Sequence, residues 1–267
     1  MNANRVSAIV LRQVYLIRGS FSRVVPLFAW VGIDIVLWGF ITKYLNSVAG
    51  SGFNFVPVIL GAVLLWDFFM RVMQGVTMAF FEDVWSRNFL NFFATPLSMT
   101  EYVGGLVITS ILTSSIGLLF MLLLAILVFG FSFFSYGLVL WPFLLILFMF
   151  GIALGIFASA MVLRLGPSAE WFVWPIPALL SPFVCVFYPL STLPQWMGII
   201  SRLLPPAYVF ESVRAVISGH PFPGIYLIAG IFLDISYILL AYLSFSRTYR
   251  YAVRNGLIAR YSAESVN

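Results

Sequence analysis

The chain has 267 residues, of which 62% are hydrophobic and only 9% are charged, and its net charge is +5. A soluble domain carries about 25% charged residues, so this composition cannot supply a water-facing surface; its high hydrophobicity also excludes disorder. The composition therefore predicts an integral membrane protein.

The basic residues lie near the ends of apolar runs, and all of them except Lys43 are arginine. This distribution favours a role in membrane orientation over nucleic-acid binding. The single cysteine, Cys185, lies inside an apolar run, and we interpret it as a small buried residue.

Residues 3–23 mix basic and apolar side chains. Apolar positions recur there at three- and four-residue spacing, and Arg5, Arg12, Arg18 and Arg23 lie between them. This pattern predicts a helix that lies in the membrane interface. A plain cytosolic lead-in is the alternative, because Arg18 disturbs the polar face.

The first two membrane spans are predicted at about residues 24–42 and 55–76. The first contains Asp34, and the second contains Asp67 and Arg71. Charged side chains inside spans are costly and are candidates for function. Asp67 and Arg71 are four residues apart, so they share one helix face, and we favour a structural ion pair between them.

Residues 80–101 form the longest polar interruption of the chain. Aromatic residues at helical spacing predict a short amphipathic helix over residues 82–97, which is stopped at Pro96. Ser98 and Glu101 then have the spacing of a capping box, which predicts the start of the next helix.

The segment from Tyr102 to Leu163 contains no charged residue. As one helix it would be about 93 Å long, roughly three times the thickness of a bilayer core, so it must turn back. The turn is predicted at residues 131–137, between spans at about 103–130 and 138–162. A polar loop from Arg164 to Glu170 follows.

A fifth span at residues 171–189 is predicted to be irregular because it is rich in proline. Residues 190–223 are apolar but broken, which predicts a re-entrant segment shielded by protein. Within it, Glu211 and Arg214 are three residues apart on a predicted helix, where a local pair is compatible with a gating role. The last span, about residues 224–245, contains Asp234 and precedes a basic tail.

Six spans with both termini in the cytoplasm place eleven basic residues inside and three outside, as the positive-inside rule requires. Five spans would put the two arginine-rich ends on opposite sides. The predicted fold is therefore an all-α membrane protein with a single transmembrane domain over residues 1–267.

Enzymatic motifs are missing from the sequence. It has no phosphate-binding loop, and His220, the only histidine, lies in a predicted turn. A histidine triad or a zinc cluster therefore lacks its components, so we predict no catalytic residue and no metal site.

Three features together resemble the membrane subunit of ATP-binding-cassette exporters, the type-2 permease family. Residues 82–105, EDVWSRNFLNFFATPLSMTEYVGG, are similar to the family's cytoplasmic segment between the second and third spans. Residues 187–214, FYPLSTLPQWMGIISRLLPPAYVFESVR, are similar to its segment after the fifth span. The third feature is the overall plan of an interfacial helix, six spans and a basic tail.

The resemblance implies that residues 82–97 are a coupling helix that docks on a separate ATPase subunit. ATP and Mg²⁺ would bind to that partner, and this chain would bind no cofactor. The implied contacts are Glu82, Asp83, Trp85, Arg87, Asn88 and Phe89. The loop with Arg164 and Glu170 would make a second, smaller contact.

The resemblance also implies a transport path. The first, second and fifth spans would form this path at a homodimer interface. The segment 190–214 would cap the path on the outer face, with Glu211 and Arg214 at the outer gate.

We therefore expect the permease subunit of an ATP-driven exporter in the plasma membrane, with a drug, a lipid or a lipid-linked glycan as substrate and no nucleic-acid partner. The alternative is a proton-coupled secondary transporter that uses Asp34, Asp67 or Asp234. Such folds often contain internal repeats, and none is found in the two halves. A membrane-embedded enzyme or assembly factor is a third possibility, and the missing catalytic clusters argue against the enzyme only.

Overall fold

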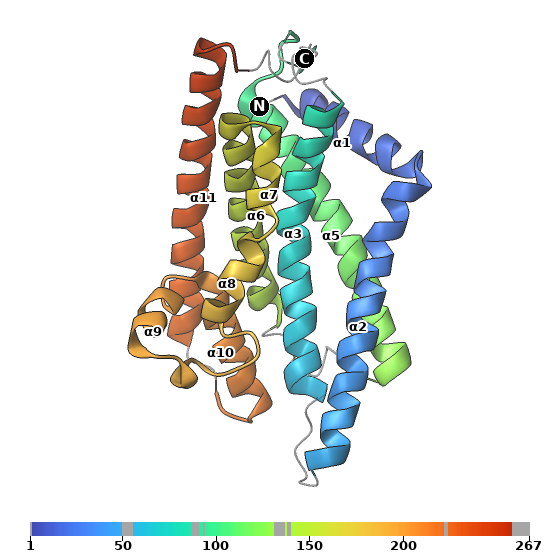
Figure 1. Ribbon diagram of the computed structural model, residues 1–267, viewed down its shortest axis with the longest axis vertical. Coiled ribbons are helices and arrows are strands. Elements are labelled where there is room, and N and C mark those ends of the chain that lie inside the picture. Colours follow the sequence, from blue (N-terminus) through green and yellow to red (C-terminus); the bar gives the residue numbers. More distant parts are fainter. Residues whose placement is uncertain are drawn as a thin grey trace.

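Long apolar helices build the molecule. The computed structural model describes residues 2–49, 56–86, 91–92, 94–130, 137, 140–221 and 224–257. Within this part of the chain, five helical segments are long and apolar enough to cross a membrane. Figure 1 shows them side by side as a bundle, and no strand occurs among the described residues.

The chain alternates between long helices and shorter helical elements. The long elements are α2 (Phe21–Ala49), α3 (Gly61–Trp85) with the π-helical turn η1 (Val56–Leu60) before it, α5 (Met99–Phe129), α6 (Leu140–Leu165) and α11 (Gly224–Arg254). The shorter elements are α1 (Ala3–Arg18), η3 (Pro167–Ala169), α7 (Glu170–Val173), α8 (Ile176–Val184), η4 (Leu190–Thr192), α9 (Gln195–Ser201) and α10 (Pro205–Ile217).

Helices α3 and α6 form the centre of the bundle. Their most apolar stretches are 61% and 72% buried, against 17–22% for α2, α5 and α11. Small residues let the two central helices approach closely: a Cβ on Gly155 of α6 would lie only 2.8 Å from the Met73 carbonyl oxygen of α3. Close backbone approach through small residues is a common way to pack membrane helices.

The bundle has two distinct ends. Helix α1, the last turns of α3, α6 and α11, and the first turn of α5 lie at one end, here called the α1 end (Figure 1). Helices α9 and α10 and the first turn of α11 lie at the other, the α9–α10 end. Because α1 and the end of α11 share one end, the chain passes along the bundle an even number of times.

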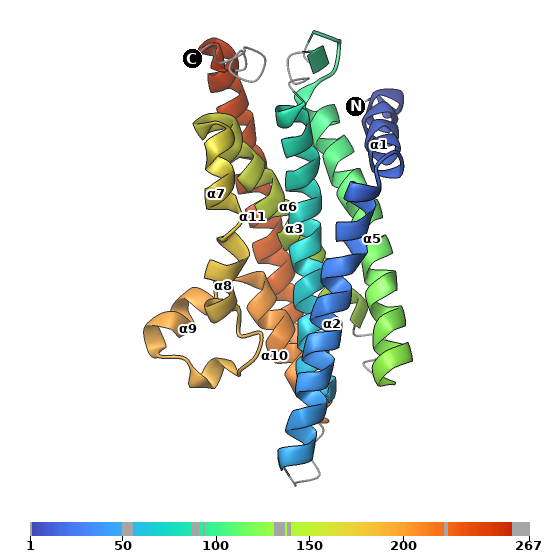
Figure 2. The ribbon, with the colours of Figure 1, turned by 45° about the vertical axis from the view of Figure 1, so that its right-hand side comes forward.

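The predicted fifth span, residues 171–189, is not one helix. It consists of α7 and α8, which follow each other from the α1 end toward the α9–α10 end (Figures 1 and 2). The chain turns at Trp174–Pro175, and α8 ends at Cys185, whose φ of 60° is left-handed. Proline and this left-handed residue break the helix, as the proline content predicted, and neither piece is long enough to span a bilayer.

The second span is longer than predicted. Helix α3 continues past residue 76 to Trp85, so Glu82, Asp83 and Trp85 belong to its last turn and not to a separate amphipathic helix. The helix continues because Phe80, Phe81 and Val84 are buried against neighbouring elements. The turn predicted at residues 131–137 lies almost entirely outside the described residues, but α5 and α6 are separate helices on either side of it.

Candidate functional site at the α1 end

The last turn of α3 carries three of the residues predicted to contact a partner. Trp85 is 49% exposed, whereas Asp83 is fully buried. Glu82 pairs with Arg23 at the start of α2, with 2.9 Å between Oε1 and Nε. The other predicted contacts, Arg87, Asn88 and Phe89, lie outside the described residues. Among the described residues of this turn, Trp85 therefore has the large exposed side chain that a partner could contact.

Asp83 connects three helices. Its carboxylate forms an ion pair with Arg12 of α1 and accepts a hydrogen bond of 2.7 Å from the hydroxyl group of Tyr102 of α5. Tyr102 is itself buried, and the Arg12 guanidinium lies 4.7 Å from the centre of the Phe92 ring. Asp83 was predicted to contact a partner protein, but the structure places it behind the surface, where it joins α1, α3 and α5.

Helix α1 packs on the bundle through one stripe of side chains. Val6, Ile9 and Gln13 are buried, at helical spacing. Ile9 fits against Gly105 of α5, where a Cβ would lie 2.6 Å from the Ile9 Cγ2 atom, and the Gln13 amide donates to the Ala79 carbonyl oxygen at 3.2 Å. The buried stripe therefore fixes α1 to the ends of α3 and α5, and Arg12 adds a charged contact at its side.

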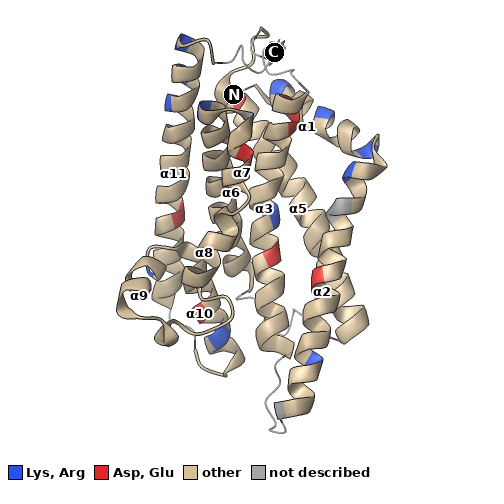
Figure 3. Cartoon of the chain, in the orientation of Figure 1, with Lys and Arg blue, Asp and Glu red and all other residues tan. Residues whose placement is uncertain are grey.

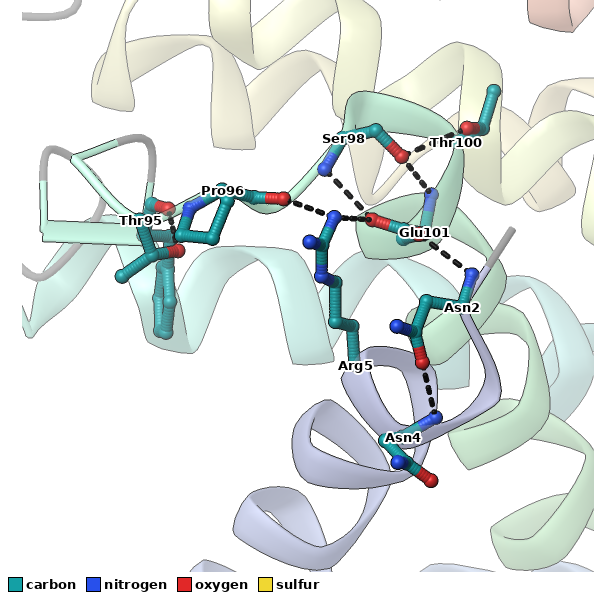
Figure 4. A network of polar contacts seen from close by, with 9 residues as sticks. Asn2, Asn4, Arg5, Thr95, Pro96, Ser98, Thr100 and Glu101 are labelled. Atoms are coloured by element: carbon teal, nitrogen blue, oxygen red, sulfur yellow. Dashed lines mark hydrogen bonds and ion pairs between the residues drawn. The ribbon is translucent and has the colours of Figure 1, made fainter.

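Glu101 gathers a second polar network at the start of α5 (Figure 4). The predicted capping box is confirmed, since the Ser98 amide donates to Glu101 Oε2 at 2.9 Å and the Glu101 amide donates to Ser98 Oγ at 3.3 Å. The Asn2 amide donates to Glu101 Oε1 at 2.7 Å. Arg5 contacts both Glu101 Oε2, at 3.5 Å, and the carbonyl oxygen of Pro96.

The two networks stand on either side of the connection from α3 to α5. Asp83 lies just before residues 86–98 and Glu101 lies just after them, and α1 contacts both, through Arg12 and Arg5. Arg5 also holds Pro96 within the connection itself. Movement of this connection would therefore act directly on α1 and on the ends of α3 and α5.

The second predicted contact also lies at the α1 end. Arg164 is exposed near the end of α6, and Glu170 begins α7. Glu170 Oε1 accepts a hydrogen bond of 3.2 Å from the indole nitrogen of Trp174. The loop between them turns at Gly166, whose φ of 101° favours glycine.

The family of the chain follows from a comparison with known protein families. A family model described as an ABC-2 type transporter matches residues 7–218, more than three quarters of the chain. The chain belongs to the ABC-2 type transporter family. A search among curated proteins found no match.

The match confirms the predicted resemblance to type-2 permeases. ABC-2 chains are membrane transport subunits, typically not catalytic themselves, and they normally pair with an ATP-binding subunit. This ABC-2 chain is therefore a membrane-embedded, multi-pass protein of an ABC transporter. Among the described residues, no cluster of His, Cys, Asp and Glu could hold a metal ion.

The predicted outer pair of this ABC-2 chain is formed at the α9–α10 end. Glu211 and Arg214 of α10 lie 2.8 Å apart. Arg214 also donates to the carbonyl oxygens of Cys185, at 2.6 Å, and Val186, at 3.3 Å, and Glu211 accepts from the Leu190 amide at 2.8 Å. The pair therefore ties α10 to the end of α8 and the beginning of η4.

The intramembrane charges of the ABC-2 chain are arranged differently from the prediction. The ion pairs of the described residues do not include a direct pair between Asp67 and Arg71. Arg71 instead reaches α5, where a Cβ on Gly117 would lie 2.9 Å from its Nη1 atom, and it interacts with Asp67 and with Asp34 of α2 at longer range. Asp234 of α11 is fully buried, and neither of its carboxylate oxygens has a hydrogen-bond partner in the part of the chain that the structure describes.

Tyr102 and the roles of Arg12 and Arg5 were not predicted from the sequence. Arg12 and Asp83 are separated by 71 residues, and Tyr102 by a further 19. Such partners have no local spacing that could reveal them. The pairs Ser98–Glu101 and Glu211–Arg214 were predicted because the members of each pair are three positions apart, which brings them together at the start or on one face of a helix.

Proposed function

We propose that this chain is the permease subunit of an ATP-driven exporter in the plasma membrane. A separate ATPase subunit docks at the α1 end, on Trp85 and the segment up to residue 97, with the loop from Arg164 to Glu170 as a second contact. ATP and Mg²⁺ bind to that partner. Hydrolysis on the partner moves the connection between α3 and α5, and two copies of the permease open and close a path between them.

One observation carries the proposal: the polar connection between α3 and α5 is linked on both sides to α1. Arg12 holds Asp83 before the connection, and Arg5 holds Glu101 and Pro96 after it. A force that a partner applies to this connection would be transmitted through these contacts to the ends of α1, α3 and α5.

The charge distribution supports a cytoplasmic α1 end. Figure 3 shows basic residues gathered on α1 and at the end of α11. Basic residues close to membrane spans favour the cytoplasmic side. A cytosolic ATPase would meet this end of the bundle.

In this proposal α7 and α8 together make the fifth of six crossings, and residues 190–223 form the re-entrant outer segment. A broken crossing is tolerated where protein covers its free backbone groups. Helix α2 is largely uncovered in the single chain and has free surface for a second copy. The substrate is a drug, a lipid or a lipid-linked glycan, and Glu211 and Arg214 act at the outer gate.

Affinity purification of the permease tests the docking site. We expect Trp85→Ala combined with Arg87→Ala to reduce the yield of the co-purified ATPase subunit strongly. Trp196→Ala is the matched control, because Trp196 is 60% exposed but lies at the α9–α10 end. Full ATPase yield and normal transport with the double variant would overturn the docking site.

The alternative, a proton-coupled secondary transporter, gains no support from the family match. Transport assays in sealed vesicles separate the two mechanisms. The proposal predicts transport that needs ATP and continues without a pH gradient. Transport that needs a pH gradient and no ATP would instead favour the use of Asp34, Asp67 or Asp234 as proton carriers.

A further inference from the structure

Half-way along the bundle, α2 and α3 carry more acidic than basic charge (Figure 3). Asp34 of α2 and Asp67 of α3 both interact with Arg71 of α3, and Asp34 also interacts with Asp67. Lys43, the other charge on the membrane part of α2, lies over the rings of Phe40 and Phe129, at 6.0 and 5.7 Å from their centres. The two carboxylates therefore lie within longer-range electrostatic reach of one guanidinium, and among the described residues neither forms a direct ion pair with it.

Two polar atoms near this group have no hydrogen-bond partner among the described residues. Asp67 Oδ2 is buried without a hydrogen bond. Ser114 of α5 is 2% exposed, and its hydroxyl group also lacks a partner. Ser114 lies on the face of α5 that packs on α3, since Ser110 donates to the Val72 carbonyl oxygen at 2.8 Å and Gly117 contacts Arg71. The unpartnered atoms thus lie on the two helices that enclose Arg71.

An uncompensated negative charge is costly in the middle of a membrane protein. When Asp34 and Asp67 are both ionised, Arg71 neutralises only one of them, and buried polar atoms without partners cost free energy as well. A positively charged ligand would supply the missing charge. N–H groups on such a ligand would also donate hydrogen bonds to the unpartnered oxygen atoms. The group therefore favours a cation over a neutral or anionic ligand.

The surface beside Asp34 is apolar. Ile33, Leu37 and Ile41 are close to Asp34 on the helix, and together with further residues of α2 they form an open apolar face of this helix. The residues of this face are Ile33, Val36, Leu37, Phe40, Ile41 and Tyr44. A carboxylate beside an apolar helix face suits a ligand with a cationic head and an apolar body.

We propose that Asp34, Asp67 and Ser114 form a binding site for the cationic group of an amphiphilic organic substrate. This inference rests on the proposed function, because it places the site on the path of the exporter. Asp34, which is half-buried, meets the cation first, and Asp67 attracts it from the interior. Arg71 partly neutralises the charge of the two aspartates when the site is empty, and it competes with a bound cation for them.

Binding of two ions of the same shape and opposite charge tests the proposal. Tetraphenylphosphonium and tetraphenylborate would each be titrated onto the purified permease in nanodiscs, with empty nanodiscs subtracted. We expect saturable binding of tetraphenylphosphonium only. Asp34→Asn and Asp67→Asn should each weaken it about tenfold or more, as expected for loss of one member of a buried charge pair.

Two further variants separate binding from mere stability. Arg71→Gln removes the competing positive charge and should strengthen tetraphenylphosphonium binding, which a purely structural role for the three residues does not predict. Asp234→Asn makes the same chemical change at a buried aspartate of α11 and should leave binding unchanged. Melting temperatures of all variants identify any that fail to fold.

Equal binding of both ions, or tetraphenylphosphonium binding that is unchanged in Asp34→Asn and Asp67→Asn, would overturn this inference. The measurement uses no ATPase, so it is independent of the docking experiment. An exporter that hydrolyses ATP normally and transports only neutral or anionic compounds would keep the proposed function and remove the cation site.

Discussion

At the scale of single residues, the buried contact between Arg12, Asp83 and Tyr102 fixes the α1 end. Asp83 is fully buried, whereas Arg12 keeps one quarter of its side chain exposed. Removing one member of a buried pair is costly because the remaining charge loses its partner in a poorly solvated place. The contact therefore defines the position of α1 more strictly than the more exposed pair of Arg23 and Glu82.

The Arg12→Ala variant should unfold at a lower temperature than the wild type, with a loss of about 1–3 kcal/mol, because Asp83 is left with Tyr102 as its remaining partner. Adding Asp83→Asn should recover part of this loss, since the asparagine carries no charge. Thermal unfolding in detergent measures both effects.

Arg23→Ala is the control for this pair of variants. The same substitution in the more exposed pair should cost about 0–1 kcal/mol. Additive losses from Arg12→Ala and Asp83→Asn would contradict a direct interaction between the two side chains.

Local spacing decided which residue contacts could be predicted. The capping box of Ser98 and Glu101 and the pair of Glu211 and Arg214 are confirmed, because helix geometry brings residues three apart together. Asp67 and Arg71 have equally good spacing, but Arg71 turns to Gly117 of α5. The sequence of α3 alone does not show that Gly117 on another helix leaves space for the Arg71 side chain.

At the scale of elements, glycine sets the distance between α3 and α6. Gly151 and Gly155 are one turn apart on α6, and each meets backbone oxygen atoms of α3. A side chain on either would push the two central helices apart. The spacing of these glycines is readable in the sequence, but only the packing shows which helix they face.

Gly155→Ala should destabilise the protein by about 1–3 kcal/mol, because the new Cβ would lie 2.8 Å from the Met73 carbonyl oxygen and 2.7 Å from the Val76 Cβ atom. Gly198→Ala provides the matched control. Gly198 lies in α9 with open space around its Cβ position, so alanine there should be neutral or slightly stabilising. Equal melting temperatures for the two variants would contradict the close contact of α3 and α6.

Element ends were predicted less well than element positions, for physical reasons. The end of α3 was placed too early because Glu82 and Asp83 suggest a water-exposed segment. In the structure, α1 and α5 cover this turn, and Asp83 is neutralised by Arg12. The irregular passage of α7 and α8 was predicted correctly because proline acts locally, whatever packs around it.

At the scale of the whole molecule, the even number of passes along the bundle places α1 and the end of α11 together (Figure 1). Cys185 is buried and is the only cysteine, so a Cys185→Ser background allows single cysteines to report the topology. Ser7, Ser47 and Asn255 are exposed and suit this purpose.

In that background, an impermeant maleimide should label Ser47→Cys in intact cells, because this residue lies at the end of α2 away from the α1 end. Ser7→Cys and Asn255→Cys should be labelled only after the membrane is opened. Labelling of just one of these two in intact cells would mean an odd number of crossings.

Docking of a separate ATPase at the α1 end, beside the last turn of α3, can be tested by site-specific photo-crosslinking. A crosslinking amino acid is placed at Trp85 or, for comparison, at Trp196, in the assembled transporter. We predict a covalent adduct between the permease and the ATPase subunit from position 85 and none from position 196. An intact complex that gives no adduct from position 85, or an adduct from position 196, would mean that the ATPase does not dock at the α1 end.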